Sequence, residues 1–95
     1  MRKIDWSNAI KKDYKRLRSN PRYARDIEQL LEAVVLLLVE DRALPENCRD
    51  HALVGNWLGY RECHVKPDLL LIYSLPDNFT LRLARLGSHS ELFKR

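Results

Sequence analysis

The hydrophobic periodicity of this chain changes once, and that change constrains the fold more than any other feature of the sequence. Before Leu44-Pro45, apolar residues recur at spacings of three and four, the period of an amphipathic helix. After it, short runs alternate with a period of two and are separated by Gly, Pro, Asn and Asp. We therefore predict an α+β fold, in which two helices pack on one face of a mainly antiparallel sheet.

Two helices are predicted in the first half of the chain. The first begins at a candidate N-cap, Ser7, and ends at residues 19–21, Ser-Asn-Pro, which also start the second. The second extends to about Glu40. Three residues widen its apolar face near its end: Leu36, Leu37 and Val39. This apolar surplus either packs inside the molecule or contacts a partner protein.

The strands are predicted from the runs of alternating residues. An edge strand is expected at 2–5, and the remaining strands at about 51–54, 58–65, 69–75 and 79–86. The run 69–73 is apolar on both faces, which is typical of a central strand. The result is a small sandwich with a sheet of four to five strands. A chain of 95 residues has room for one domain only, so we assign 1–95 to a single domain.

Composition mainly excludes classes of protein. Two cysteines, Cys48 and Cys63, do not form a disulfide framework and are expected as reduced thiols. The longest apolar run, 33–39, is too short to span a membrane, and the first residues lack the apolar region of a signal peptide. We therefore predict a soluble, cytoplasmic protein.

The net charge is +4 and is unevenly distributed. Residues 1–25 contain nine Lys or Arg and only two Asp or Glu. Residues 26–50 contain two Lys or Arg and seven Asp or Glu. This pattern indicates either two solvated helix faces that attract each other or a basic face for RNA or a protein partner.

All three histidines, His51, His64 and His89, lie after residue 50. Side chains alternate along 58–65, so His64 shares a face with Tyr60 and Glu62, opposite Cys63 and Val65. Because the neighbouring residues Cys63 and His64 point to opposite faces, they cannot easily hold one zinc ion, and we predict no metal site.

In an antiparallel meander, alternate strand ends meet at one edge of the sheet. The histidines, Asp68 and Arg85 are therefore candidates to converge. Such a set suits RNA cleavage by attack of a 2′-hydroxyl on the adjacent phosphate, with imidazoles moving protons and a cation offsetting the phosphorane charge. Strict alternation along 79–85, however, places Arg85 on the core face. Either the strand bulges or ends before it, or Arg82 contacts the phosphate instead.

Four motifs occur in a characteristic order. Residues 51–61 read His-Ala-Leu-Val-Gly-Asn-Trp-Leu-Gly-Tyr-Arg, residues 64–68 read His-Val-Lys-Pro-Asp, residues 71–73 read Leu-Ile-Tyr, and residues 85–93 read Arg-Leu-Gly-Ser-His-Ser-Glu-Leu-Phe. This order closely resembles the YafQ branch of the RelE/ParE toxin superfamily. The match covers about half the chain, while the helical half matches in layout only.

The resemblance implies a RelE-like fold and a specific activity. Proteins of this family are toxins of type II toxin–antitoxin systems. They are ribosome-dependent endoribonucleases, or mRNA interferases, that cut mRNA in the ribosomal A site without a metal or another cofactor. A cognate antitoxin neutralises them, and the complex binds operator DNA through the antitoxin.

The resemblance also implies roles for individual residues. Four residues correspond to the acid–base set: His51, His64, Asp68 and His89. His89 is the best candidate for the general acid, Arg85 corresponds to the phosphate-stabilising cation, and Phe93 to an aromatic side chain that places the substrate base or His89. Many relatives have Trp where this chain has Leu69. If that Trp stacks on RNA, Leu69 removes a platform and changes codon preference or rate.

Two other functions remain open from the sequence. The ParE branch shares the fold but poisons DNA gyrase and cleaves no RNA, so the chain is alternatively a binding toxin of that kind. The second alternative is an interaction protein whose catalytic site is vestigial. In the sequence, only Leu69 supports this alternative.

Overall fold

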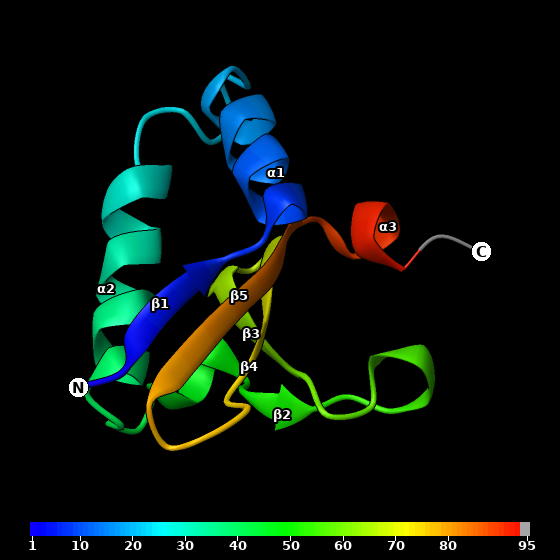
Figure 1. The fold of residues 1–95 in the computed structure, drawn as a ribbon. Coiled ribbons are helices and arrows are strands. Elements are labelled where there is room, and N and C mark those ends of the chain that lie inside the picture. Colours follow the sequence, from blue (N-terminus) through cyan, green and yellow to red (C-terminus); the bar gives the residue numbers. More distant parts are fainter. Residues whose placement is uncertain (94–95) are drawn as a thin grey trace.

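The computed structural model describes residues 1–93, which form a five-stranded sheet and three helices (Figure 1). The elements are, in chain order, β1 (Lys3–Trp6), α1 (Asn8–Arg18), α2 (Ile27–Val39), β2 (His51–Ala52), β3 (Arg61–Lys66), β4 (Leu69–Ser74), β5 (Thr80–Gly87) and α3 (His89–Leu92). Short 3-10 turns at Glu46–Cys48 and Gly55–Trp57 flank β2. The two long helices and the strands after them confirm the predicted α+β order.

The strands are arranged in the order β1-β5-β4-β3-β2. β1 pairs with β5 in parallel, and the other neighbours are antiparallel. β4 is central, and all six of its residues are buried, as its apolar run predicts. β2 and β3 are shorter than predicted, because the chain between them turns at Gly55 and Gly59, whose φ angles are +66° and +93°.

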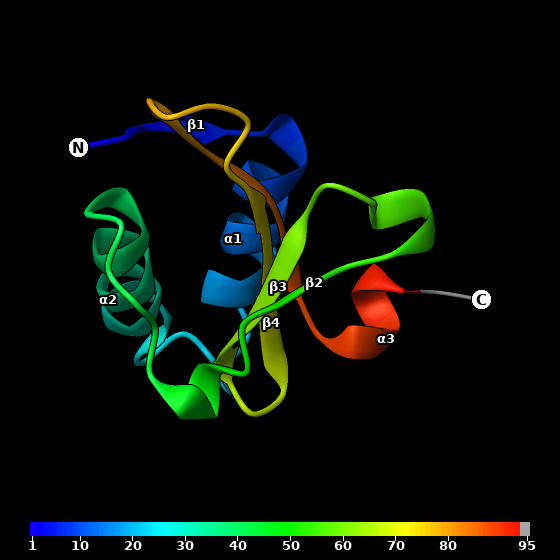
Figure 2. The same cartoon turned by 90° about the horizontal axis from the view of Figure 1, so that it is seen from below.

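The main core lies between the sheet and the two long helices. Figure 2 looks along the sheet and shows α2 on one side of it and α3 with the β2–β3 loop on the other. The helix-covered face contains the buried residues of α1 and α2 together with Cys63, Leu69, Leu71, Tyr73, Leu81, Leu83 and Leu86. Val39 is packed in this core, whereas Leu36 is 52% exposed. The apolar surplus at the end of α2 is therefore only partly absorbed by the fold.

The opposite face, which we call the open face, has a much smaller apolar cluster. It consists of four buried residues, Leu70, Ile72, Ala84 and Leu92. Residues of the β2–β3 loop and Phe93 pack against it. Among residues 1–93, the four-residue helix α3 and this loop are what covers the face, so the side chains of His64 in β3 and Arg85 in β5 remain partly exposed.

β5 contains a bulge that decides where Arg85 lies. Arg85 pairs with Ile72, but Tyr73 pairs with Leu83, so Ala84 is an extra residue without a partner in β4. The bulge places Arg85 opposite Ile72 of the open face, and the alternation resumes with Leu86 on the helix side. Of the alternatives left by the sequence, the structure shows the bulge.

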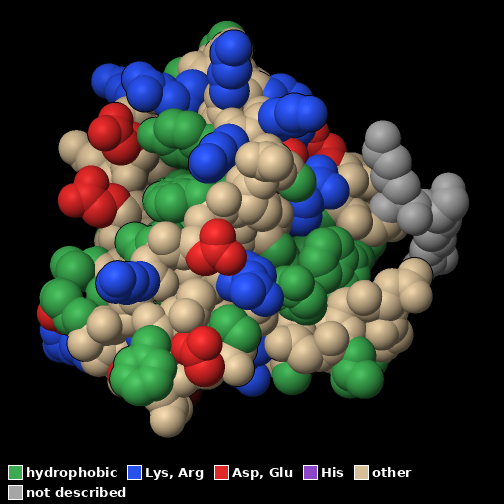
Figure 3. Space-filling model, in the orientation of Figure 1, with side chains coloured by type: hydrophobic (Ala, Val, Ile, Leu, Met, Phe, Trp, Pro, Cys, Tyr) green, Lys and Arg blue, Asp and Glu red, His purple; other side chains and the backbone are tan. Residues whose placement is uncertain are grey.

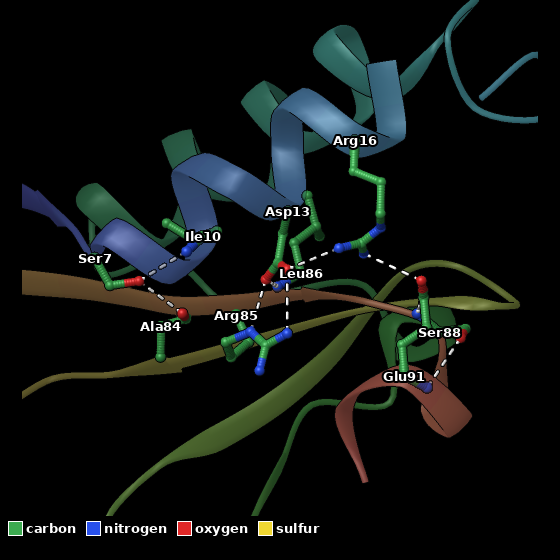
Figure 4. A network of polar contacts seen from close by, with 9 residues as sticks. All are labelled: Ser7, Ile10, Asp13, Arg16, Ala84, Arg85, Leu86, Ser88 and Glu91. Carbon is green, nitrogen blue, oxygen red and sulfur yellow. Dashed lines mark hydrogen bonds and ion pairs between the residues drawn. The ribbon is translucent and has the colours of Figure 1, made fainter. Parts of the chain in front are cut away.

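Ser7 joins this bulge to the start of α1. Its hydroxyl accepts a hydrogen bond from the amide of Ile10, which confirms the predicted N-cap, and donates to the carbonyl of Ala84 at 2.7 Å. One side chain therefore caps the helix and fixes the position of the bulge beneath it (Figure 4).

The charged side chains are segregated on the surface. Figure 3 shows Lys and Arg gathered at the α1 end of the molecule and apolar side chains between α1 and α2. Eight residues of β1, α1 and α2 line an apolar groove there: Ile4, Trp6, Lys11, Tyr14, Glu28, Leu31, Glu32 and Val35. Among residues 1–93, no ion pair joins α1 to α2. The opposite charges of the two helices therefore do not hold them together directly.

The sequence predictions about the cysteines and about a membrane span can both be compared with the structure. Cys48 and Cys63 are free thiols, both are buried, and this burial raises the pKa of each. Within the part of the chain that the structure describes, none of the helices has the length and apolar character needed to cross a membrane.

Candidate active site

Two of the predicted histidines face one carboxylate on the open face. β2 and β3 pair so that His51 lies opposite Glu62, and His64 is two residues further along β3. The Nε2 atoms of His51 and His64 lie 3.7 and 3.9 Å from Oε1 of Glu62. The exposed fractions of the two histidine side chains are 52% and 22%, whereas Glu62 is buried. The fold thus brings two imidazoles together around a shielded carboxylate.

The hydrogen bonds of the two rings define their reactive nitrogens. Nδ1 of His51 lies 2.7 Å from the carbonyl oxygen of Arg49, and Nδ1 of His64 lies 3.2 Å from that of Pro67. Because a carbonyl oxygen only accepts, Nδ1 carries the proton in each ring. Nε2 of each neutral ring is then free to accept a proton, and the resulting imidazolium would be paired with Glu62. Either histidine can serve as a general base.

Glu62 was not among the residues that the sequence predicts for the site. The alternation along 58–65 had already placed it on the face of His64, and that signal was sufficient to find it. Its pairing with His51 across two strands was not available from the sequence, because it depends on the β2–β3 register.

Asp50 is a second residue without a predicted role. Its carboxylate accepts hydrogen bonds from the hydroxyl of Tyr73 at 2.6 Å and from Arg61 at 3.2 and 3.3 Å. Burial and this contact raise the pKa of Tyr73, so the hydroxyl stays protonated. Asp50, which directly precedes His51, is therefore bound to the central strand β4.

Asp68 lies at the β3–β4 turn, and its contacts are with the connection between α1 and α2. Its Oδ2 accepts a hydrogen bond from the hydroxyl of Tyr23 at 2.9 Å and forms an ion pair with Arg22. Burial, followed by the Asp68 contact, raises the pKa of Tyr23. The structure thus gives Asp68 a cation and a phenol as neighbours, while Glu62 is the carboxylate beside the histidines.

Arg85 forms a two-pronged ion pair with Asp13 of α1 (Figure 4). Nε of Arg85 lies 2.8 Å from Oδ2, and Nη2 lies 3.1 Å from Oδ1. Asp13 also accepts a hydrogen bond from the amide of Leu86. Burial alone would raise the pKa of Asp13, but the contacts with Arg85 and Leu86 outweigh it, so the pKa is lowered. The same pair raises the pKa of Arg85.

His89 begins α3 and is exposed, while Phe93 directly follows the helix and is half-buried. Their ring centroids are 4.9 Å apart, with the planes inclined at 42°. The helix starts with a capping box: the amide of Glu91 donates to the Ser88 hydroxyl, and Glu91 accepts from the Ser88 amide. These contacts, led by the Ser88 amide, lower the pKa of Glu91 despite its partial burial.

Gly87 allows α3 to approach the end of β5. A Cβ atom at this position would lie 3.1 Å from Oε1 of Glu91 and 3.3 Å from Leu92. Leu92 is buried in the open-face cluster and anchors the helix there. Next to it, a hollow of about 440 Å³ is lined by Leu53, Val54, Asn56, Trp57, Leu92 and Phe93.

The predicted site residues therefore fall into four neighbourhoods. His51 and His64 surround Glu62, Arg85 pairs with Asp13, and His89 packs on Phe93 in α3. Asp68 contacts the α1–α2 connection. Arg82, the alternative to Arg85, is paired with Asp5 at the surface.

The structure corrects the interpretation of Leu69. This side chain is completely buried in the core beneath the helices. A residue here does not present its side chain to RNA on the open face, because the alternation of β4 turns it toward α1 and α2. In this chain the position belongs to the core, so Leu69 no longer supports a vestigial site.

No group of three or more His, Cys, Asp or Glu side chains within residues 1–93 is placed to hold a metal ion. The reaction suggested by the side chains present is acid–base chemistry. Imidazoles with free Nε2 atoms, a guanidinium held by an ion pair and a further exposed histidine are groups of the kind that suit phosphodiester cleavage by proton transfer.

Comparison with known proteins finds relatives along nearly the whole chain. The family model described as the bacterial toxin of the type II toxin–antitoxin system, YafQ, matches residues 2–94. The mRNA interferase toxin YafQ of Escherichia coli K12 is 39% identical over 92 residues, which cover 97% of this chain and 96% of that protein.

Solved structures give the same result. The crystal structure of a metal-bound toxin from Helicobacter pylori has a TM-score of 0.87 and 45% identity, and the match covers 98% of this chain and 100% of that one. The crystal structure of the E. coli DinJ–YafQ toxin–antitoxin complex has a TM-score of 0.83 and 35% identity, covering 98% and 99%. The predicted fold class and the resemblance of the four motifs are both confirmed.

Proposed function

Because this chain belongs to the YafQ family of bacterial toxins, we propose that it is an mRNA interferase, the endoribonuclease toxin of a type II toxin–antitoxin system. The observation that carries this proposal is the arrangement of the open face. Two histidines with available Nε2 atoms surround Glu62, and this face also holds Arg85 and the helix of His89.

In the proposed reaction, the substrate supplies its own nucleophile. Nε2 of His51 or His64 removes the proton of a 2′-hydroxyl, and this oxygen attacks the adjacent phosphorus. Arg85 offsets the additional negative charge of the phosphorane, and His89 gives a proton to the 5′-oxygen as its bond to phosphorus breaks. The products are a 2′,3′-cyclic phosphate and a 5′-hydroxyl.

The remaining predicted residues have supporting roles in this proposal. Phe93 packs on the His89 ring and restricts its orientation, and it also lines the hollow beside the β2–β3 loop. Asp68, held by Arg22 and Tyr23, lines a hollow together with Ser88 and Glu91 of the α3 capping box, and it would be the further member of the acid–base set. Arg85 is preferred to Arg82 because the bulge places it on the open face.

The partners in this proposal are the ribosome, mRNA and a cognate antitoxin. A site that, within residues 1–93, is covered by a short helix and a loop holds little substrate by itself, so the ribosomal A site would position the mRNA. The DinJ–YafQ complex is a precedent for the antitoxin. Operator DNA would be contacted indirectly, through that antitoxin, and the site of action would be the cytoplasm.

The test is cleavage of a translated mRNA by the wild type and by His89→Ala. We expect new 5′ ends within the reading frame for the wild type, and a rate about 10²- to 10⁴-fold lower for the variant, the range for loss of a general acid. Because His89 is exposed, the melting temperature of the His89→Ala variant should equal that of the wild type. Ser90→Ala, at the next exposed position of α3, is the matched control and should cleave normally.

Other outcomes would identify the alternatives. Equal cleavage by His89→Ala and the wild type would remove His89 from the mechanism. Gyrase-trapped DNA breaks with intact mRNA would indicate a ParE-like binding toxin, and antitoxin binding without cleavage an interaction protein. Metal content measured on the active protein tests the proposed metal-free reaction, since the H. pylori relative is described as metal-bound.

A further inference from the structure

Asp13 is a buried carboxylate for which neither the sequence nor the comparisons suggest a role. It projects from α1 toward the end of β5, and its side chain is only 4% exposed (Figure 4). Its two oxygens accept four hydrogen bonds, two from Arg85, one from Arg16 and one from the amide of Leu86. A carboxylate so shielded from water and so fully paired is costly to desolvate, and it holds its partners in a defined geometry.

The contact with Arg85 fixes the orientation of the guanidinium. Nε and Nη2 form one edge of this planar group, and both point at the Asp13 carboxylate. The edge that carries Nη1 lies outside this fork. Because Arg85 is 31% exposed, the same side chain without its partner would sample many rotamers. Asp13 thus holds the cation in one orientation before substrate arrives.

The backbone contact reinforces this effect. The amide of Leu86 lies 3.0 Å from Oδ2 of Asp13, directly after the bulged part of β5. The same carboxylate therefore holds both the side chain of Arg85 and the strand immediately after it. A change at Asp13 would shift the guanidinium through both connections.

A weaker branch leads from Asp13 to α3. Arg16 contacts Oδ1 of Asp13 at 3.2 Å and Oε2 of Glu91 at 3.2 Å, and Glu91 belongs to the capping box before His89. Arg16 and Glu91 are 46% and 39% exposed. Ion pairs this exposed contribute little, so this branch is secondary to the Arg85 contact.

We propose that Asp13 is a positioning residue for RNA cleavage, which acts by fixing the guanidinium of Arg85 toward the scissile phosphate. This inference rests on the proposed function and adds a residue outside all four sequence motifs. Asp13 lies too deep to touch substrate, so its effect on the reaction passes through Arg85. A misplaced cation stabilises the phosphorane poorly, because charge stabilisation in a transition state depends on prior orientation.

The experiment is a double-mutant cycle with Asp13→Asn, Arg85→Ala and the double variant, measured as rates of cleavage of a translated mRNA. Asn has the shape of Asp, and its carbonyl oxygen still accepts from the Leu86 amide, but it lacks the charge and the second acceptor. We expect Asp13→Asn alone to lower the rate about 10- to 100-fold. With Arg85 already replaced, we expect a further loss of at most about fivefold, the effect of an exposed ion pair.

A purely structural role predicts a different result. It would lower the rate by the same factor whether or not Arg85 is present, and that outcome would overturn the inference, as would wild-type cleavage by Asp13→Asn. The matched control is Asp5→Asn, which removes the partner of Arg82, the other arginine of β5, and should leave cleavage unchanged. Cleavage failing in the wild type itself would instead refute the proposed function.

Arg85→Lys provides a second route if Asp13→Asn does not fold at the assay temperature. Lys keeps the positive charge but cannot form the two-pronged contact with Asp13. We expect at least about a tenfold loss of cleavage, with a circular dichroism spectrum like that of the wild type. A wild-type rate for Arg85→Lys would show that a fixed orientation is not required.

Discussion

The two faces of the sheet differ in how they are covered. On one face, α1 and α2 enclose a continuous core that includes Leu69, Leu71 and Leu83. On the other, four buried residues and a four-residue helix leave the ends of β3 and β5 accessible. Stability is therefore concentrated on the helix-covered face, and the open face leaves polar side chains exposed at the cost of apolar burial.

The boundary between the two faces is where the candidate chemistry is organised. Arg85 lies on the open face because of the bulge, but its partner Asp13 comes from α1, on the helix side. A cation placed in this way is accessible on the open face and is also held by the helix-covered part of the molecule. Arg85 is thus exposed on one face, while Asp13, which holds it, is buried on the other.

Adjacent residues of β4 test the comparison most strongly, because Leu71 faces the helices and Leu70 the open face. Both are almost completely buried. We expect Leu71→Ala to lower the free energy of unfolding near the upper end of about 2–5 kcal/mol, and Leu70→Ala near the lower end, since α3 and the β2–β3 loop can move into the space. Urea unfolding of both variants measures this, and equal losses would contradict it.

A smaller effect is expected for Leu69→Trp, which introduces the residue found in many relatives. Because Leu69 is fully buried, the larger ring should overpack the helix-covered core and lower the free energy of unfolding by about 1–3 kcal/mol. Leu58→Trp is the matched control at a position that is 77% exposed, and should be nearly neutral. Faster cleavage by Leu69→Trp without a loss of stability would mean that this position reaches RNA.

The smallest effect concerns the pH dependence of stability. The folded protein holds the pKa of Asp13 below its ordinary value of 3.8, so the stabilisation from its ionised form is complete at neutral pH and is lost as the pH falls below 3.8 toward the folded pKa. Asp13→Asn should therefore lose less stability than the wild type between pH 7 and acidic pH. Unfolding in urea across this range measures the difference, with Asp5→Asn as control. An unchanged pH dependence in Asp13→Asn would contradict the assignment.

Much of the fold could be predicted because it depends on local pattern. Periodicity predicts helix α2 and the central position of β4. Residue type predicts the N-cap at Ser7. The strand boundaries near Gly55 and Gly59 were predicted less well, since the 3-10 turn at Gly55–Trp57 is followed by a further turn at 58–59, and β3 begins only at Arg61. Turn residues show that a chain reverses, but not where pairing resumes.

The candidate site was predictable to a different extent. The motifs identify which histidines to consider, and the alternation along β3 places His64 beside Glu62. The contacts of His51 with Glu62 and of Arg85 with Asp13 join residues from separate elements. No spacing rule predicts such pairs, because they are set by strand register and by the packing of α1 on the sheet.

The sequence by itself therefore determined the family, the order of helices and strands, and the residues able to move protons. These features depend on residue type and short-range spacing. Only the tertiary structure decided that a bulge turns Arg85 to the open face, that Leu69 is core, and that Asp13 is the partner of the cation. The physical reason is that burial and charge pairing depend on which distant segments pack together, and such packing leaves no local signal in the sequence.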